Sequence, residues 1–313
     1  MAELVYAYGL GPYPARVGGS SPLRPTILNQ LNFGLIKNMA SAIERQDDGT
    51  IKFIIVIPRD LIKKTRLDVL GELVKNANIA GFRKGKAPKK LIEEKTDKEK
   101  VKEEILKKLL PNAYARALEE HNVKPVISPR IHVEKLEDDK DWEFTALTCE
   151  APEIELNGYK EAIKKVTAKS KIIIAGKEPQ PPSFDEIVGE LLKSVQVKIA
   201  DIIIEQEVER LLSQTLSEIK KLGLTLERYL ASTGKTADSL KDEYRNRAEN
   251  DIKLEFILSK IAEEEKITIS NEEINEAIQK AKDDGERKNL EENRYLLASI
   301  LRQQKTLDFL KNL

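Results

Sequence analysis

The apolar residues of this chain follow two different spacings, and this difference constrains its fold more than any other feature. Residues 51–57 (IKFIIVI) are a run of β-branched and apolar side chains between Gly49 and Pro58, as is typical of a buried β-strand. From Ser183 onward, apolar residues instead recur every three or four positions, as on one buried face of an α-helix. We therefore expect an α+β domain followed by an all-α domain, and a chain that is mainly α-helical.

The first domain is expected to span residues 39–155. After the strand, Asp60 can begin one helix and Asp97 another, because an aspartate side chain accepts hydrogen bonds from the free N–H groups of a first helical turn. Two strand-like segments, residues 125–134 and 142–149, follow the second helix. The expected order is strand, helix, loop, helix, strand, strand.

The second domain, residues 183–313, carries signals that begin and end helices. Thr236 and Ser270 are suitable N-caps, and Gly223 and Gly234 can end helices in a left-handed conformation. Most residues of the apolar stripes are expected in the core. Two of these stripes are Val208, Leu211, Leu212, Leu216, Ile219 and Leu222, and Leu290, Leu297, Ile300, Leu301, Leu307 and Leu310. Helices of this length joined by short loops predict an antiparallel bundle with arms.

Basic residues without acidic neighbours gather between the two helices of the first domain. Residues 73–92 contain no Asp or Glu, but they contain six cations: Lys75, Arg83, Lys84, Lys86, Lys89 and Lys90. Their mutual repulsion would be relieved by phosphate groups. Phe82 lies among them as an apolar anchor, and Gly81 and Gly85 permit a tight turn. Such a segment is suited to binding both an RNA backbone and a crevice on a protein. The alternative interpretation is a solvated turn with Phe82 packed into the core.

Residues 81–88, GFRKGKAP, lie between two predicted helices and resemble the ribosome-docking signature of the trigger factor family. The resemblance implies that Phe82, Arg83 and Lys84 form the tip that contacts a protein beside the nascent-chain exit tunnel and adjacent ribosomal RNA. Gly81, Gly85, Lys86 and Pro88 complete the motif, with Lys75, Lys89 and Lys90 as supporting cations. Residues 39–155 would then be a ribosome-binding domain, which binds the large subunit near its exit tunnel.

The C-terminal half carries a second resemblance to the same family. Residues 223–230 (GLTLERYL), 233–236 (TGKT) and 304–310 (QKTLDFL) are similar to its C-terminal chaperone domain. This resemblance implies that residues 183–313 form a helical cradle that shields unfolded or nascent polypeptides, in the cytoplasm. Client contacts in such a cradle are diffuse, so we nominate no individual client-binding residues.

The segment between the two domains is too short for the FKBP-like prolyl isomerase of full-length family members. Residues 156–182 are Lys-rich and end in a Pro-rich stretch, and we interpret them as a strand and linker that replace that domain. An isomerase also needs an aromatic-walled pocket, but residues 155–200 include only Tyr159 and Phe184 as aromatics. We therefore expect no appreciable isomerase activity and no catalytic residues.

Residues 1–38 differ in composition from the remainder of the chain. Residues 1–26 are rich in Gly, Pro, Tyr and Ser and contain no Lys. Residues 17–22 can be encoded by a sequence containing GGTTCAAGTCC, as found in a transfer-RNA T-arm. Our hypothesis is that residues 1–38 are a disordered or mis-annotated extension and that synthesis starts near Met39.

Other functional classes find little support in the sequence. His121, His132 and Cys149 do not have metal-ligand spacing, so neither a metal nor a small-molecule cofactor is expected. No apolar run approaches the roughly 18–20 residues that a membrane span requires. Two alternatives to a ribosome-associated chaperone stay open: an RNA-binding protein that uses residues 73–92, and an isomerase-type folding enzyme.

Overall fold

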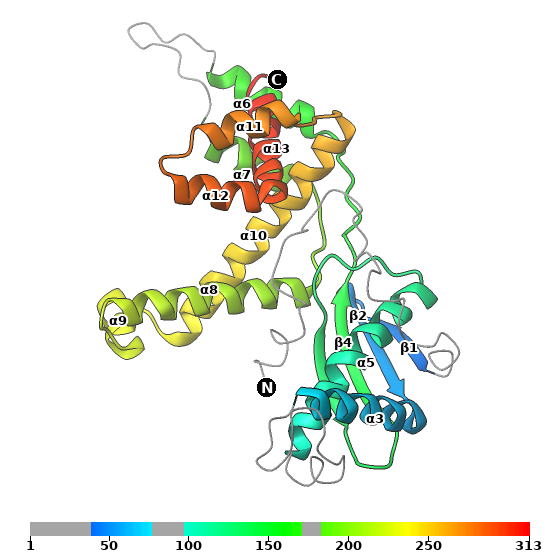
Figure 1. Cartoon of the computed structure of the whole chain (residues 1–313). Helices are drawn as coiled ribbons and strands as arrows, with labels where there is room; N and C mark the ends of the chain where they lie inside the picture. Colours follow the sequence, from blue (N-terminus) through cyan, green and yellow to red (C-terminus); the bar gives the residue numbers. More distant parts are fainter. Residues whose placement is uncertain (1–38, 77–96, 171–182) are drawn as a thin grey trace, which may run out of the picture. The chain divides into compact units, whose positions relative to one another are not determined.

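The computed structural model describes residues 39–76, 97–170 and 183–313 (Figure 1). The predictions for residues 1–38, 77–96 and 171–182 lie outside these residues. The described chain forms two compact units, residues 39–150 and 151–313, and each is treated by itself below. No helix in the described ranges is long and apolar enough to cross a membrane.

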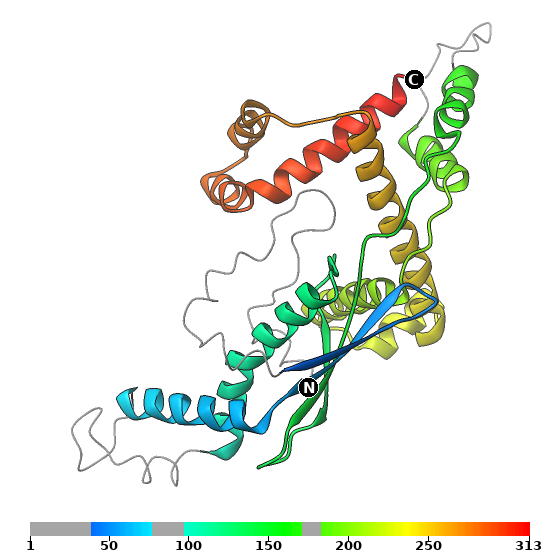
Figure 2. The same cartoon turned by 90° about the vertical axis from the view of Figure 1, so that its right-hand side faces the viewer.

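The first unit contains a four-stranded antiparallel sheet in the order β1-β2-β4-β3. Its strands are β1 (Ala40–Arg45), β2 (Thr50–Ile57), β3 (Arg130–Lys135) and β4 (Trp142–Cys149). Alternate residues of the central strands are fully buried, among them Phe53 on β2 and Phe144 on β4. The helices α3 (Arg59–Asn76) and α5 (Lys98–Glu120) pack together, and α5 also contacts β2, as Figure 2 shows. The expected α+β architecture is confirmed.

Strand β1 was not predicted from the sequence. Its residues, ASAIER, include small and charged side chains of low β-propensity and only Ile43 as a large apolar one. The strand forms because it pairs with β2, where Ile43 lies opposite Phe53. Strand β3 likewise begins at Arg130, later than expected, since Pro129 cannot donate a ladder hydrogen bond.

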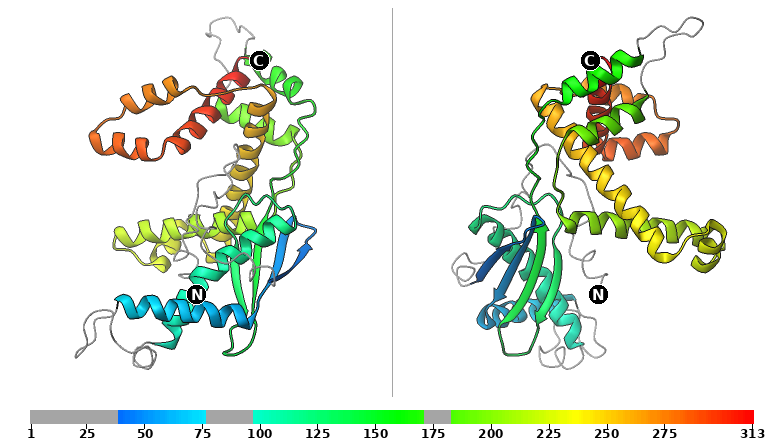
Figure 3. Two further views of the ribbon diagram at one scale, coloured as in Figure 1. Left: turned by 45° about the vertical axis from the view of Figure 1, so that its right-hand side comes forward. Right: turned by 180° about the vertical axis from the view of Figure 1, so that it is seen from behind.

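The second unit is entirely helical apart from extended connections. Its helices are α6 (Tyr159–Ser170), α7 (Phe184–Ser194), α8 (Asp201–Lys221), α9 (Leu226–Thr233), α10 (Ala237–Glu264), α11 (Asn271–Gln279), α12 (Asp284–Glu292) and α13 (Arg294–Lys311). In this unit Thr236 and Ser270 form capping boxes as predicted, and Gly234 ends α9 with a φ of 66°. In the first unit, by contrast, Asp60 lies within the first turn of α3 and is not its N-cap. α8 packs beside α10, with α9 where they join (Figure 3).

Two apolar clusters join six of these helices. Ile163, Ile187, Leu191, Ile257 and Leu310 belong to the larger cluster, which joins α6, α7, α10 and α13. A smaller cluster joins α11, α12 and the first half of α13. Because α13 takes part in both, it connects the body of the unit to the α11–α12 pair.

Residues 159–170 form a helix, although the sequence predicted a strand and linker there. Tyr159 is 3% exposed and Ile163 is fully buried, so one face of α6 is part of the core of the second unit. The Tyr159 hydroxyl also donates a 2.9 Å hydrogen bond to Glu265, at the end of α10. The lysines that suggested a linker include Lys160, Lys164 and Lys165. Lys164 and Lys165 lie on the exposed face, whereas Lys160 is half-buried and pairs with Glu265.

Candidate functional site

The basic segment predicted from the sequence is connected at both ends to packed helices. α3 ends at Asn76, and α5 begins after Asp97, whose side chain accepts a hydrogen bond from the backbone N–H of Glu99. Lys108 Nζ lies 2.6 Å from Glu72 Oε2, which joins α5 to the last turns of α3. The helices therefore fix the positions of Asn76 and Asp97, the described residues on either side of the intervening ones.

Lys75 is the predicted site residue that the structure describes. Its side chain is exposed in the last turn of α3, where the partial negative charge of the helix end favours a cation. The remaining predicted residues lie outside the described ranges: Gly81, Phe82, Arg83, Lys84, Gly85, Lys86, Pro88, Lys89 and Lys90. Their roles, and the placement of Phe82, stay predictions.

Several cations of the neighbouring helices are neutralised locally. Lys107 lies 2.9 Å from both Glu103 and Glu104, and hydrogen bonds to these carboxylates raise the pKa of Lys107. Lys63 lies 2.8 Å from Asp139, which lowers the pKa of that carboxyl group. Residues 73–92 contain no acidic residue to do the same. The cations of that segment therefore have no acidic partner within the segment itself.

The two histidines lie in different structural settings: His121 packs against neighbouring side chains, and His132 belongs to a strand. The His121 ring packs against Phe53, with ring centroids 5.8 Å apart, and its Nε2 lies 3.2 Å from Ser41 Oγ. His132 lies on β3. Within the described residues no group of three or more His, Cys, Asp or Glu side chains could hold a metal ion.

The second unit exposes apolar side chains that sequence reasoning did not single out. Leu216, Leu222 and Leu224 are exposed around the α8–α9 connection, and Leu222 is 74% exposed. Tyr295, Leu296 and Ile300 are exposed on α13. Leu216, Leu222 and Ile300 lie in apolar stripes expected in the core, so the helical spacing alone did not distinguish them from buried neighbours. Large apolar residues left exposed on several helices are suited to binding apolar chain segments.

Comparison with known protein families gives two matches, one after the other along the chain. Residues 39–173 match the family model described as bacterial trigger factor protein, and residues 183–312 match the model of the trigger factor C-terminus. Residues 174–182 separate the two, and neither matched model is an isomerase domain.

Trigger factors of two bacteria are among the relatives that match part of the chain. The trigger factor of Natranaerobius thermophilus is 34% identical over 122 residues, which is 39% of this chain and 27% of that protein. The trigger factor of Staphylococcus aureus is 31% identical over 122 residues, or 39% of this chain and 28% of that protein. The matched part therefore spans little more than a quarter of each relative's length.

A solved structure of the trigger factor chaperone, from work on promiscuous substrate recognition in folding and assembly, has a similar fold. It superposes with a TM-score of 0.56 at 14% identity, covering 87% of this chain and 99% of that one. The two family matches, their order along the chain and the shared fold agree. The chain belongs to the trigger factor family, as a variant in which no FKBP-like domain lies between the N-terminal and C-terminal domains.

Proposed function

We propose that the protein is a cytoplasmic ribosome-associated chaperone. It docks on the large subunit beside the nascent-chain exit tunnel and shields emerging polypeptides. The observation that carries the proposal is the sequence GFRKGKAP, located between two packed helices of a trigger factor N-terminal domain. Phe82 provides the apolar contact with a ribosomal protein, and Arg83 and Lys84 pair with phosphates of ribosomal RNA.

Ribosome docking on this basis depends on salt. Each cation that neutralises a phosphate releases counterions, so affinity falls as the salt concentration rises. The apolar contact of Phe82 is far less sensitive to salt. Docking that used both would therefore weaken at high salt without disappearing.

Client shielding is the role proposed for the second unit. Its exposed apolar residues lie on separate helices rather than in one deep pocket, including Leu222 beside α8 and Ile300 on α13. Dispersed apolar contacts can hold many unrelated sequences, because no single pocket must be filled. The expected ligands are unfolded or nascent polypeptides.

Co-sedimentation with ribosomes tests the docking role. We expect the Phe82→Ala/Arg83→Ala/Lys84→Ala protein to lose most ribosome binding while its thermal unfolding stays unchanged. A matched control is Lys220→Ala/Lys221→Ala/Leu222→Ala, which removes two exposed cations and an exposed apolar residue from the second unit. Equal binding by the two variants would contradict the proposal.

The six cations of residues 73–92 also favour a second candidate, a general RNA-binding protein. Such a protein would bind isolated ribosomal RNA as tightly as intact ribosomes at equal salt. A ribosome-docking chaperone prefers the intact particle, because Phe82 finds its partner only there. Competition between labelled RNA and ribosomes separates the two functions.

Prolyl isomerase activity is not part of the proposed function. The support is the arrangement of the family matches, which leaves only residues 174–182 between the two domains. Refolding of a model protein limited by prolyl isomerisation should proceed at its uncatalysed rate in the presence of this chain. Strong acceleration would contradict this part of the proposal.

A further inference from the structure

Two extended segments of the second unit have the side-chain alternation of β-strands. In residues 151–157, Ile154 and Leu156 pack against the core, whereas Glu153 and Glu155 are exposed. In residues 195–200, Val195 and Ile199 are buried, whereas Gln196 is exposed. This period of two is the pattern of a half-buried strand.

The main chain of these segments is not used in a sheet. Glu153, Ile154, Glu155, Gln196 and Val197 make no backbone-to-backbone hydrogen bond with another residue of the described chain. An extended backbone of this kind presents a row of N–H and C=O groups. It is a template to which another extended chain can add.

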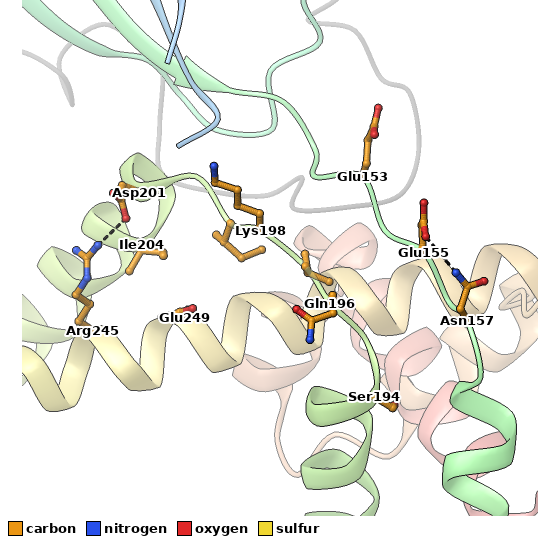
Figure 4. A pocket seen from close by; sticks show the side chains of 12 residues that line it. Glu153, Glu155, Asn157, Ser194, Gln196, Lys198, Asp201, Ile204, Arg245 and Glu249 are labelled. Carbon is orange, nitrogen blue, oxygen red and sulfur yellow. Dashed lines mark hydrogen bonds and ion pairs between the residues drawn. The ribbon is translucent and has the colours of Figure 1, made fainter. Parts of the chain in front are cut away.

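A cleft of about 660 Å³ lies between the two segments, with α10 on one side (Figure 4). Its volume is within the range of roughly 300–1,000 Å³ that is common for ligand sites. Both extended segments contribute to the lining, which includes Glu155, Gln196 and Val197. The cleft is therefore lined by the same backbone that could accept an added strand.

The cleft has an excess of acidic side chains. Glu153, Glu155, Asp201 and Glu249 line it, against Lys198 and Arg245. Arg245 lies 2.5 Å from Asp201, as the dashed line in Figure 4 shows, and Glu249 lies 2.5 Å from Lys253, so these charges compensate one another. Glu153 and Glu155 then remain against Lys198. The excess negative charge favours a ligand that carries cations.

We propose that this cleft binds an extended segment of an unfolded polypeptide that carries Lys or Arg. The added segment hydrogen-bonds through its main chain to residues 153–155 or 196–197, and its cations lie near Glu153 and Glu155. Main-chain pairing is independent of sequence, which suits a ligand as varied as an unfolded chain. The inference rests on the proposed chaperone function, because it names one mode by which that function holds its clients.

Fluorescence anisotropy of the full chain tests the cleft. The probe is a labelled peptide of alternating Lys and Thr. Two peptides serve as comparisons: one with Glu in place of Lys, and one with alternate backbone nitrogens methylated. We expect tight binding of the first peptide alone.

The Glu153→Gln/Glu155→Gln protein should bind it roughly fivefold more weakly at low salt. Glu276→Gln/Glu291→Gln, which removes two exposed carboxylates elsewhere in the same unit, should bind it normally.

Equal binding of the methylated peptide, or equal weakening by both protein variants, would overturn the inference. Binding that is seen only after removal of residues 1–38 would assign the cleft to the chain's own N-terminal segment and would overturn it as well. Suppression of client aggregation is measured in parallel. A protein that suppresses aggregation but fails the peptide test leaves the proposed function intact, whereas failure of both assays contradicts the proposed function itself.

Discussion

The described parts of the two units differ in how many of their large apolar residues are exposed to solvent. In the described part of the first unit, Leu67 and Val133 are the exposed large apolar residues. In the described part of the second unit there are seven: Phe184, Leu216, Leu222, Leu224, Tyr295, Leu296 and Ile300. Trp142, Phe53 and Phe144 of the first unit are at most 2% exposed. The described part of the first unit is therefore well packed, and this unit also contains the basic segment. The second unit leaves several large apolar side chains exposed, where a partner can contact them.

The largest expected effect is on stability and comes from the core of the first unit. Phe53→Ala removes a fully buried ring from the central strand and should lower the free energy of unfolding by about 3–5 kcal/mol. Thermal unfolding measures this loss. Leu67→Ala is the control: it removes an apolar side chain that is 62% exposed and should change stability by at most about 0.5 kcal/mol. Similar losses for both would contradict the burial described for the first unit.

The next effect tests whether α6 belongs to the body of the second unit. Ile163→Ala should cost about 2–5 kcal/mol, because the Ile163 side chain is fully buried against that core. Chemical denaturation of this protein is compared with that of Lys165→Ala, which changes an exposed residue of the same helix. If residues 159–170 acted only as a linker, the two proteins would be equally stable.

The exposed apolar residues of the second unit should affect function more than stability. Leu222→Ser/Leu296→Ser/Ile300→Ser should weaken suppression of client aggregation several-fold, because it removes apolar contact area. Its melting temperature should stay within a few degrees of the unmodified protein's, since exposed substitutions rarely cost much stability. Unchanged suppression at equal stability would show that clients bind elsewhere.

The smallest effect concerns pH. Lys160 and the Tyr159 hydroxyl bond to Glu265 and lower the pKa of its carboxyl group below the usual 4.5. A carboxyl group with a lowered pKa in the folded state stabilises the fold above its unfolded pKa, and this contribution is lost as the pH falls through the folded value. Glu265→Gln should therefore reduce stability slightly at pH 7.

The difference between the two proteins should vanish in acid. Melting temperatures measured from about pH 7 to pH 3 follow this convergence. A gap that stayed constant over the whole range would mean that the substitution acts through packing and not through the charge of Glu265.

Much of this architecture could be predicted because the helices carry their own signals. Asp97, Thr236 and Ser270 each cap the helix that the sequence assigned to them. Caps are local, so they can be read without knowledge of tertiary packing. Strand β1 depends on its pairing with β2 and could not be read in this way.

Exposure was harder to predict than secondary structure. Leu216 and Ile219 belong to one apolar stripe, yet Leu216 is 47% exposed and Ile219 is 4% exposed. Whether another helix covers a residue depends on how far that neighbour extends, which spacing does not reveal. The basic segment is the converse case. Its residues were predicted from composition and from a family motif, neither of which requires knowledge of packing.

Docking as proposed requires that Phe82 contacts the ribosome beside the exit tunnel. The most direct measurement places a photoreactive phenylalanine analogue at position 82, irradiates the protein with ribosomes and identifies the cross-linked product by mass spectrometry. We expect one dominant product, formed with a large-subunit protein at the tunnel exit and competed by unmodified protein. Products spread over many ribosomal proteins, or none above the level given by the same analogue at position 222, would contradict it.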